Sequence, residues 1–505
     1  MSNPLYDVLF ASHKGKSTTF IIDSLNKKEV SYDAFLKQAA QYAHAITEQG
    51  LQPGDCLAAQ VGKSVSTLAL YAACVQAGVV YLPLNTAYTF SEVEYFIKDS
   101  GSKLLVCNSS SAQVMESLSK SYNTIIMTQS DDGLQGSLPD LAKKLPTTFT
   151  TADRTLDDIA SFLYTSGTTG RSKGAMLTQN NLLSNCETLQ EVWEFTKDDV
   201  LLHALPIFHI HGLFVAVNIA LKSGAKLIFE PSFDLDRIIM LLPKATALMG
   251  VPTFYTRLLS DERFDRDLTQ HMRLFISGSA PLLSETHVQF EQRTGHRILE
   301  RYGMTETNMN ASNPYKGERR AGTVGFPLPN VELKITDPTT GEELPQGEIG
   351  QIEVRGPNVF KGYWNMPEKT AEELRSNGFF ITGDLGSIDS DGYVSIVGRN
   401  KDLIISGGYN IYPKEIELIL DEQPGVIESA VIGVPHPDFG ETVVGVLVAD
   451  KNVLDIDSVQ NAVKDALARF KHPRKLVVID ALPRNTMGKV QKNILREEYK
   501  VLFMN

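Results

Sequence analysis

The sequence predicts an α/β protein with a large N-terminal domain of mixed and parallel sheets with helices and a β-subdomain, followed by a small C-terminal α+β domain. Three observations lead to this fold class. Short apolar runs alternate with capped helical stretches through the first part of the chain. Residues 322–362 are rich in Gly, Pro and short alternating runs, which is typical of antiparallel strands. The polar segment 398–402 precedes a smaller set of elements, so we expect domains over 1–400 and 401–505.

Length and composition describe an ordinary globular protein. The chain has 505 residues, which is too many for one core, and it is 42% hydrophobic and 21% charged. The net charge of −12 and the lack of any Lys/Arg run argue against nucleic acid as a partner. The cysteines show no metal-binding spacing and are expected to be buried or free thiols in a reducing compartment; they are Cys56, Cys74, Cys107 and Cys186.

No targeting or membrane segment is recognisable. Residues 1–10 lack a basic segment followed by an apolar run, so we expect no signal peptide. No stretch approaches the roughly 18 apolar residues that a membrane span needs. We therefore expect a cytoplasmic enzyme with no membrane partner.

The first hundred or so residues show the alternation clearly. Ser31 can cap a helix that ends near Gln49, and Gly78 can end a second helix that starts at Ser64. Ser91 and Glu94 form a capping-box pattern for a third helix. Strands are expected between these helices, over 18–22, 56–61, 79–82 and 103–107. The polar stretch 128–146 is poorly patterned, and we expect it to be a surface excursion.

The same alternation continues after this stretch and returns in the C-terminal part. Thr178 can cap a helix over 180–193, and Pro413 is well placed to open another helix through Leu420. A further helix is expected over 457–470. Strands are expected over 158–164, 175–177, 200–205, 225–229, 247–250, 429–434, 442–448 and 475–478.

A loop of small residues lies between the strands 158–164 and 175–177. Its glycines allow backbone N–H groups to approach an anion, its hydroxyls donate further hydrogen bonds, and Lys173 adds a charge suited to phosphate. It is not a Walker A loop, because Gly174 stands where that motif has Ser or Thr. The predicted phosphate-binding residues are Thr165, Ser166, Gly167, Thr168, Thr169, Gly170 and Lys173.

This loop resembles the phosphate-binding signature of the adenylate-forming superfamily, which includes acyl-CoA synthetases, firefly-type luciferases and peptide-synthetase adenylation domains. Three further motifs of that family occur in the expected order: 300–307, 379–385 and 483–492. The resemblance therefore covers nearly the whole chain. It implies that ATP and CoA are co-substrates, that Mg²⁺ is needed, and that no residue acts as a covalent nucleophile.

The resemblance assigns roles to individual residues. Thr305 would hydrogen-bond the α-phosphate, and Glu306 would be the Mg²⁺ ligand. Lys489 would be the catalytic lysine that contacts the attacking carboxylate and the α-phosphate, and its ordinary pKa already makes it a cation at neutral pH. Lys401 occupies the hinge position. The remaining ATP-binding residues implied are Gly278, Ser279, Ala280, Glu300, Arg301, Tyr302, Gly303, Asp384 and Arg399, the last two at the ribose.

The acyl pocket would be formed by 205–212 and 248–257. His209 and His211 could suggest a metal pair, but no third ligand stands close in sequence; the family instead implies that His209 contacts the substrate carboxylate. Arg257 is unusual in such a pocket, where a second carboxylate on the substrate would pair with it, together with Ser279. The alternative is that Arg257 points outward and pairs with Asp261 or Glu262.

In this pattern the chain resembles malonyl-CoA synthetases in particular. The implied reaction converts malonate, ATP and CoA to malonyl-CoA, AMP and pyrophosphate through malonyl-AMP, with methylmalonate as a second substrate. Gly407, Gly408 and Tyr409 would approach CoA. A lysine acetyltransferase and deacetylase acting on Lys489 are candidate partners, because acetylation would remove its charge. The alternatives are a synthetase for a short or aromatic monocarboxylate and a non-catalytic nucleotide-binding protein.

Overall fold

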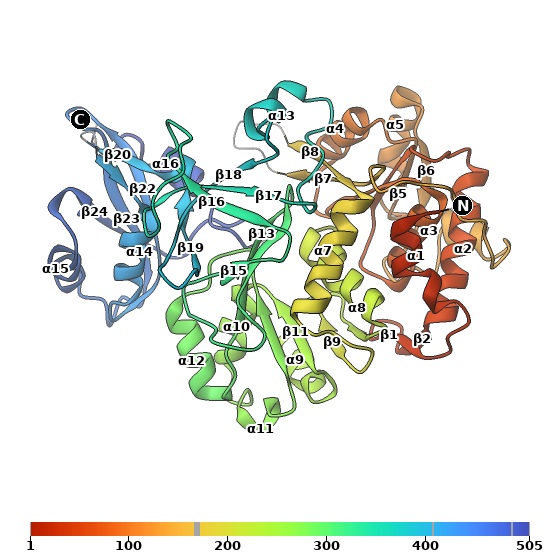
Figure 1. Cartoon of the computed structure of the whole chain (residues 1–505), viewed down its shortest axis with the longest axis horizontal. Helices are drawn as coiled ribbons and strands as arrows, with labels where there is room; N and C mark the ends of the chain where they lie inside the picture. The colour runs from red at the N-terminus through yellow and green to blue at the C-terminus, as the bar shows by residue number, and fades with distance from the viewer. Residues whose placement is uncertain (1, 166–171, 407–408, 486–487, 504–505) are drawn as a thin grey trace.

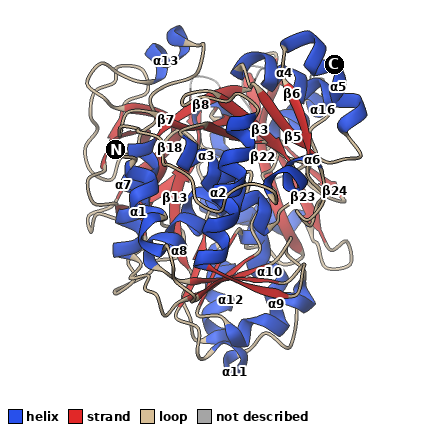
Figure 2. Ribbon diagram, turned by 90° about the vertical axis from the view of Figure 1, so that its right-hand side faces the viewer, coloured by secondary structure: helices blue, strands red, loops and turns tan. Residues whose placement is uncertain are grey.

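The computed structural model describes residues 2–165, 172–406, 409–485 and 488–503. The chain forms a large body and a smaller lobe, which contains the C-terminus and lies at the left of Figure 1. The large body contains two sheets with a layer of helices between them and further helices on their outer faces (Figure 2). The described part of the chain contains no helix long and apolar enough to cross a membrane.

The first sheet has six strands in the order β6-β5-β3-β4-β7-β8, and all neighbours are parallel except the hairpin β7–β8. Such a parallel arrangement follows from the alternating strands and helices of the sequence. The strands are β3 (Cys56–Gln60), β4 (Val80–Pro83), β5 (Leu104–Cys107), β6 (Ile125–Thr128), β7 (Ile159–Thr165) and β8 (Lys173–Thr178).

The second sheet has nine strands in the order β15-β14-β13-β12-β11-β9-β10-β1-β2. Its central strands are parallel, and antiparallel strands lie at both edges. The strands are β1 (Thr19–Asp23), β2 (Lys28–Ser31), β9 (Val200–His203), β10 (Lys226–Phe229), β11 (Ala247–Gly250), β12 (Leu274–Ser277), β13 (Leu299–Met304), β14 (Asn308–Ser312) and β15 (Phe326–Pro327).

Alternate residues of both sheets belong to different cores. Leu57 and Leu201 join the core between the sheets, whereas their neighbours Cys56 and Leu202 face the outer helices. The middle layer contains α1 (Pro4–Leu9), α2 (Tyr32–Glu48), α3 (Val65–Ala77), α7 (Gln179–Val192) and α8 (Asn218–Ser223). The outer helices are α4 (Phe90–Ser100), α5 (Ala112–Tyr122), α9 (Leu235–Leu241), α10 (Pro252–Leu259), α11 (Arg266–Thr269) and α12 (Ser284–Thr294).

Two smaller sheets complete the structure. A four-stranded antiparallel sheet connects the large body to the lobe and contains β16 (Glu332–Thr336), β17 (Gly350–Arg355), β18 (Phe380–Ile388) and β19 (Val394–Arg399), with α13 (Pro367–Glu373) beside it. The lobe contains β20 (Ile404–Ser406), β21 (Tyr409–Ile411), β22 (Val426–His436), β23 (Gly440–Ala449), β24 (Lys475–Ile479), α14 (Pro413–Asp421), α15 (Ile456–Ala466) and α16 (Lys492–Tyr499).

The predicted fold class is confirmed, and three local predictions are wrong. The capping box of α4 uses Thr89 and Glu92, because the helix starts at Phe90 and not after Ser91. The stretch 128–146 is not a mere surface excursion, since it contains the helix α6 (Ser137–Ala142), whose Leu138 is fully buried. Helix α15 ends at Ala466, several residues earlier than expected.

Candidate functional site

The phosphate-loop candidates extend from the hairpin β7–β8. Thr165 and Lys173 are the last paired residues of the two strands, so the connecting loop starts and ends at neighbouring positions. Ser166, Gly167, Thr168, Thr169 and Gly170 lie outside the described residues. The Lys173 ammonium contacts the Glu373 carboxylate at 3.2 Å and lies 4.2 Å above the ring of Tyr363. Lys173 is thus held at the mouth of the loop by two side chains that the sequence analysis did not identify.

Glu306 lies in the tight turn between β13 and β14. Gly303 is required beside this turn because a Cβ there would meet the carbonyl oxygen of Asn308 at 2.0 Å. The Glu306 carboxylate is 5% exposed and accepts a hydrogen bond from the Tyr363 hydroxyl at 3.0 Å. Burial raises the pKa of Glu306, although Tyr363 and Lys173 counteract this. Thr305 precedes it in the turn and is half-buried.

One buried carboxylate of this kind fits a divalent cation. No cluster of three or more potential metal-ligating side chains exists among the described residues, so Glu306 would supply a single hard oxygen ligand. Mg²⁺ commonly binds through one or two carboxylates and the phosphates of a nucleotide. The adjacent phosphate-loop candidates Thr165 and Lys173 agree with that division of ligands.

The ribose candidates form a connected group. Asp384 and Arg399 are cross-strand neighbours on β18 and β19, and Arg399 Nε lies 2.6 Å from the Asp384 carboxylate. The Tyr302 hydroxyl donates to the other oxygen of Asp384 at 2.5 Å. Asp384 is 5% exposed at its side chain, so these two donors fix its orientation. The predicted aromatic residue beside Gly303 therefore also positions the predicted ribose ligand.

Lys489 reaches this group from the C-terminal lobe. It follows Gly488, whose φ of +74° closes a turn, and its backbone N–H donates to the Asn485 side chain at 3.0 Å. Burial and the Arg399 cation lower the pKa of Lys489, while Asp384 and Glu306 act in the opposite direction. The sequence analysis assumed an ordinary pKa. The lowered pKa results mainly from burial of the ammonium among charged groups that come from two different sheets.

The segment after β9 brings two imidazoles to the site. His211 opens the π-helical turn η2 (His211–Val217), and its Nδ1 lies 3.3 Å from the Ser279 hydroxyl. Ser279 has a left-handed φ of +71°, which is costly for a non-glycine residue and which directs the hydroxyl toward His211. His209 Nδ1 and His211 Nε2 are buried with no hydrogen-bond partner among the described residues. Burial and nearby cations lower the pKa of His209 to about 3, so it is neutral.

Arg301 is the unexpected residue at this position. It is 3% exposed, and its Nε and Nη2 have no hydrogen-bond partner within the described ranges. Gly278 accommodates it, because a Cβ at 278 would lie 2.4 Å from the guanidinium carbon. Burial lowers the pKa of Arg301 to about 9, so it remains a cation at neutral pH. The charge of Arg301 also lowers the pKa of His209 and of His211, so the three side chains lie near one another. A buried guanidinium without a partner in the described ranges is suited to an anionic ligand.

The structure assigns Arg257 a different environment from the one expected. Its side chain is exposed on α10 and lies 5.9 Å from the ring of Phe233. The premise that Arg257 is a buried cation in need of a partner is therefore wrong, since Arg301 has that property. Nor is Asp261 a partner of Arg257, because Asp261 binds Arg263. The sequence analysis named Arg301, but only among the nucleotide-binding residues.

The neighbours of Arg301 divide between the two faces of β13. Glu300 points the opposite way, toward α12, where its Oε1 lies 3.7 Å from His287 Nδ1. Burial raises the pKa of Glu300. Ala280 and Ser279 follow β12 and are half-buried beside Gly278. Alternation along β13 thus separates Arg301 from the side chains of Glu300 and Tyr302.

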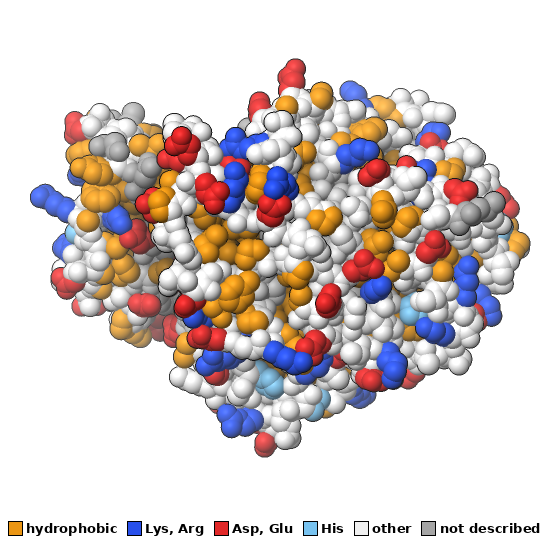
Figure 3. Space-filling view, viewed as in Figure 1, with side chains coloured by type: hydrophobic (Ala, Val, Ile, Leu, Met, Phe, Trp, Pro, Cys, Tyr) orange, Lys and Arg blue, Asp and Glu red, His pale blue; other side chains and the backbone are white. Residues whose placement is uncertain are grey.

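The hinge and CoA candidates lie where the lobe meets the large body. Lys401 belongs to the short turn η4 (Asn400–Asp402), and Asp402 forms an ion pair with Arg496 of α16. Gly407 and Gly408 lie outside the described residues. Tyr409 is 57% exposed and stacks on Phe470 with ring centroids 4.6 Å apart. Figure 3 shows a hollow between the lobe and the large body, with hydrophobic side chains along it.

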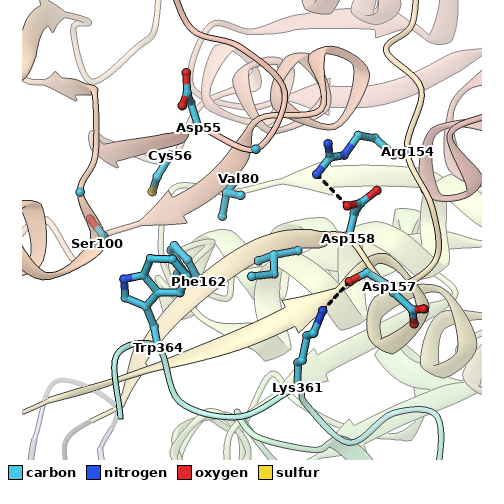
Figure 4. A pocket seen from close by; sticks show the side chains of 13 residues that line it. Asp55, Cys56, Val80, Ser100, Arg154, Asp157, Asp158, Phe162, Lys361 and Trp364 are labelled. Carbon is cyan, nitrogen blue, oxygen red and sulfur yellow. Dashed lines mark hydrogen bonds and ion pairs between the residues drawn. The ribbon is translucent and has the colours of Figure 1, made fainter. Parts of the chain in front are cut away.

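A cavity of about 280 Å³ lies elsewhere and contains none of these residues. Apolar side chains such as Val80, Phe162 and Trp364 line its centre, and Arg154 pairs with Asp158 at its edge (Figure 4). It lies at the start of β7, whereas Thr165 ends that strand about 20 Å away at the usual rise per residue. This cavity is therefore separate from the candidate site.

Comparison with known proteins gives matches over most of the chain. Residues 10–364 match the family "AMP-binding enzyme", and residues 415–489 match "AMP-binding enzyme C-terminal domain". A malonate–CoA ligase of Arabidopsis thaliana is 36% identical over 459 residues, which cover 83% of this chain and 74% of that protein. ATP-bound MatB from Rhodopseudomonas palustris is 55% identical, with a TM-score of 0.97 and full coverage of both chains.

The apo form of the same MatB is also 55% identical with full coverage of both chains, but its TM-score is 0.87. The structure is therefore more similar to the ATP-bound arrangement than to the apo arrangement. This similarity agrees with the position of Lys489 beside Asp384 and Glu306.

The strained backbone of Ser279 has a measurable cost. Replacing Ser279 by Gly should raise the free energy of unfolding by about 0.5–1 kcal/mol, because glycine adopts a φ of +71° without steric strain. Urea unfolding of both proteins measures the change. Lys27→Gly is the matched control, since Lys27 has a φ of +51° in an exposed turn. A gain for Lys27→Gly without any gain for Ser279→Gly would mean that contacts of Ser279 offset the strain.

The low pKa of His209 predicts acid sensitivity. Between about pH 6.5 and 3 an unfolded His209 binds a proton and the folded one does not, so stability is complete above pH 6.5 and declines as the pH falls. The native protein should lose roughly 1 kcal/mol more than His209→Gln between pH 6.5 and 5.5. Urea unfolding at the two pH values tests this. His436→Gln, at a partly exposed position in the lobe, is the control. Equal losses in the native protein and His209→Gln would contradict the prediction.

Proposed function

Because the chain belongs to the AMP-binding enzyme family, we propose that this site is that of an ATP-dependent malonyl-CoA synthetase. The reaction converts malonate, ATP and CoA to malonyl-CoA, AMP and pyrophosphate. The observation that carries the choice of malonate is the buried, unpaired guanidinium of Arg301. The similarity to a malonate–CoA ligase and to MatB supports the same substrate.

The distal carboxylate of malonate binds Arg301. Its Nε and Nη2 can donate to both carboxylate oxygens, which is the strongest geometry available to a carboxylate. Ser279 and His211 lie beside it and can complete the hydrogen bonds of the anion. A monocarboxylate would leave the guanidinium unpaired, and a missing partner for such a buried charge costs roughly 2–5 kcal/mol. Arg301 therefore takes the role that the sequence analysis gave to Arg257. Methylmalonate keeps both carboxylates and is a second candidate substrate.

The proximal carboxylate reacts with ATP. Its oxygen attacks the α-phosphorus, the bond to the pyrophosphate oxygen breaks, and a mixed anhydride of malonate and AMP forms. Lys489 contacts both the attacking carboxylate and the α-phosphate, and Thr305 donates to that phosphate. Thr165, Lys173 and the loop between them hold the β- and γ-phosphates. These groups stabilise charge that develops during an in-line displacement.

Glu306 would supply the protein's ligand to Mg²⁺. The cation would neutralise charge at the transferring phosphate. Tyr363 holds the Glu306 carboxylate in place by a hydrogen bond of 3.0 Å. Asp384 accepts hydrogen bonds from the ribose hydroxyls, with Tyr302 and Arg399 fixing its orientation. Glu300 remains a proposed nucleotide-binding residue, although its Oε1 lies 3.7 Å from His287 Nδ1 in this structure.

Thioester formation requires a different arrangement of the lobe. We place the domain boundary after residue 400 and the hinge at Lys401, so rotation there withdraws Lys489 from the site. Gly407, Gly408 and Tyr409 then approach CoA, whose thiolate attacks the acyl carbon and displaces AMP. Tyr409 stacks on Phe470, and Arg474 lies 4.4 Å from the ring of Phe439. An exposed surface of aromatic rings and cations suits a nucleotide with several phosphates.

A synthetase for a short or aromatic monocarboxylate is the closest alternative. It would require the Arg301 guanidinium to be paired within the protein. A non-catalytic nucleotide-binding protein would have no need for Lys489 among Asp384, Glu306 and Arg399. We also propose a cytoplasmic location and regulation by acetylation of Lys489, which would remove the charge that adenylation needs.

The test of the substrate is a paired substitution. Arg301→Met should lower kcat/KM for malonate by 30-fold or more, because the distal carboxylate loses its buried partner. Arg257→Met, which alters an exposed guanidinium, should change it less than fivefold. Pyrophosphate release with malonate, methylmalonate, acetate, butyrate and benzoate measures both variants against the native chain. If a monocarboxylate leads in the native chain, or if Arg257→Met has the larger effect, Arg301 is not the dicarboxylate clamp.

The test of Lys489 separates the two half-reactions. Lys489→Met should slow malonyl-AMP formation by 10²-fold or more, because the charge at the α-phosphate is lost. The same variant should convert synthetic malonyl-AMP and CoA to malonyl-CoA within about threefold of the native rate. Lys492→Met is the control, since Lys492 lies nearby but pairs with Glu417 of the lobe. A similar loss in both half-reactions would contradict the withdrawal of Lys489 from the site.

A further inference from the structure

Lys63 is a half-buried cation that the proposed reaction does not use. It lies between β3 and α3, and its ammonium donates to Nδ1 of His203 at 2.8 Å and to the His203 carbonyl oxygen at 2.9 Å. The ammonium also lies 4.5 Å from the ring of Phe229. Burial lowers the pKa of Lys63 strongly, with the carboxylate of Glu230 as the opposing charge. A lysine in this environment is costly to the fold, so its contacts need an explanation.

These contacts join the two large sheets. Lys63 follows a strand of the six-stranded sheet, whereas His203 ends β9 in the nine-stranded sheet. The segment after His203 turns directly into the residues of the acyl pocket. Lys63 therefore connects the end of β3 in the six-stranded sheet to the loop that follows β9 in the nine-stranded sheet.

The hydrogen bonds at His203 determine its tautomer. A carbonyl can only accept, so Nε2, which lies 2.8 Å from the carbonyl oxygen of Gly212, must carry the ring proton. Burial and Lys63 keep His203 neutral by lowering its pKa, and Nδ1 is therefore the acceptor of the lysine's hydrogen bond. Lys63 and Gly212 are thus held at the two ends of one imidazole ring.

The position of the His203 ring affects the proposed acyl pocket through Gly212. It follows His211 in the first turn of η2, and a Cβ at 212 would lie 2.0 Å from the carbonyl oxygen of Pro206. The loop from 206 to 212 is therefore closed tightly on itself. A shift of the Gly212 carbonyl must move His211, whose Nδ1 contacts Ser279 at 3.3 Å.

We propose that Lys63 is a positioning residue for the acyl carboxylate, which acts through His203 and Gly212 to hold His211 and Ser279 in place. The inference rests on the proposed function, because it takes the surroundings of His211 and Ser279 as the acyl pocket. Lys63 does not touch the substrate. It sets where two neutral polar groups stand relative to the guanidinium of Arg301, and hence how well an acid is held before it attacks ATP.

The test compares Lys63→Met with the native chain. Methionine keeps the length of the apolar stem and removes all three donors. We expect the KM for malonate to rise about tenfold, with the KM for ATP and kcat changed less than threefold. Lys226→Met is the matched control, an exposed lysine at the start of β10 that should leave every constant unchanged. A merely structural role would lower the melting temperature and affect both substrates alike.

A double-mutant cycle identifies the route. His203→Phe keeps a ring of similar size but neither nitrogen, and it should raise the KM for malonate as Lys63→Met does. If Lys63 acts through His203, the double variant should resemble either single variant rather than multiply their effects. Multiplicative effects, or equal changes in the KM values for malonate and ATP, would overturn the proposal.

The experiment also distinguishes this inference from the proposed substrate. The same constants are measured with whichever acid the native chain activates best. If that acid is not malonate, the proposed substrate is wrong, but the selective rise in the KM for the acid still decides the role of Lys63. If malonate is the best acid and Lys63→Met leaves its KM unchanged, only the positioning role is rejected.

Discussion

The Arg301 guanidinium is a buried positive charge whose Nε and Nη2 have no hydrogen-bond partner in the described part of the chain. Arg301 lies on a central strand of the larger sheet, and Gly278 on the neighbouring loop leaves room for its guanidinium. Burying such a cation costs several kcal/mol unless an anion pairs with it. The fold tolerates the cost because packing around the two large sheets is extensive. A dicarboxylate substrate, as proposed, would supply that anion.

The three histidines near Arg301 are neutral and therefore add no charge to its surroundings. His203, His209 and His211 all have lowered pKa values, because they are buried beside cations. As neutral rings they can donate or accept hydrogen bonds, and they do not repel one another. Carboxylates of the protein are kept at the nucleotide end of the site, where Glu306 and Asp384 have their own donors. The proposed acyl and nucleotide ends of the site thus differ in the charges that line them.

The C-terminal lobe stands in one particular position relative to the large body. Lys489 now stands among groups from the large body, and the similarity to an ATP-bound structure agrees with that position. The Tyr363 hydroxyl lies within hydrogen-bond distance of both Glu306 and Glu373, and Glu373 in turn binds Lys173. Since a hydroxyl carries one proton, it can serve only one of these carboxylates fully at a time. Tyr363 and Glu373 thus connect the proposed Mg²⁺ ligand Glu306 to the proposed phosphate-binding residue Lys173.

The sequence by itself determined the order of elements and the fold class, because strand and helix periodicity are local properties. It also predicted nucleotide-binding residues such as Thr165, Lys173, Glu306 and Asp384, because they stand in contiguous motifs. Only the tertiary structure decided which arginine is buried, since both Arg257 and Arg301 stand in plausible motifs and differ only in what packs against them. The contacts of Tyr363 and Lys63 join segments far apart in the chain, and no local pattern encodes such contacts.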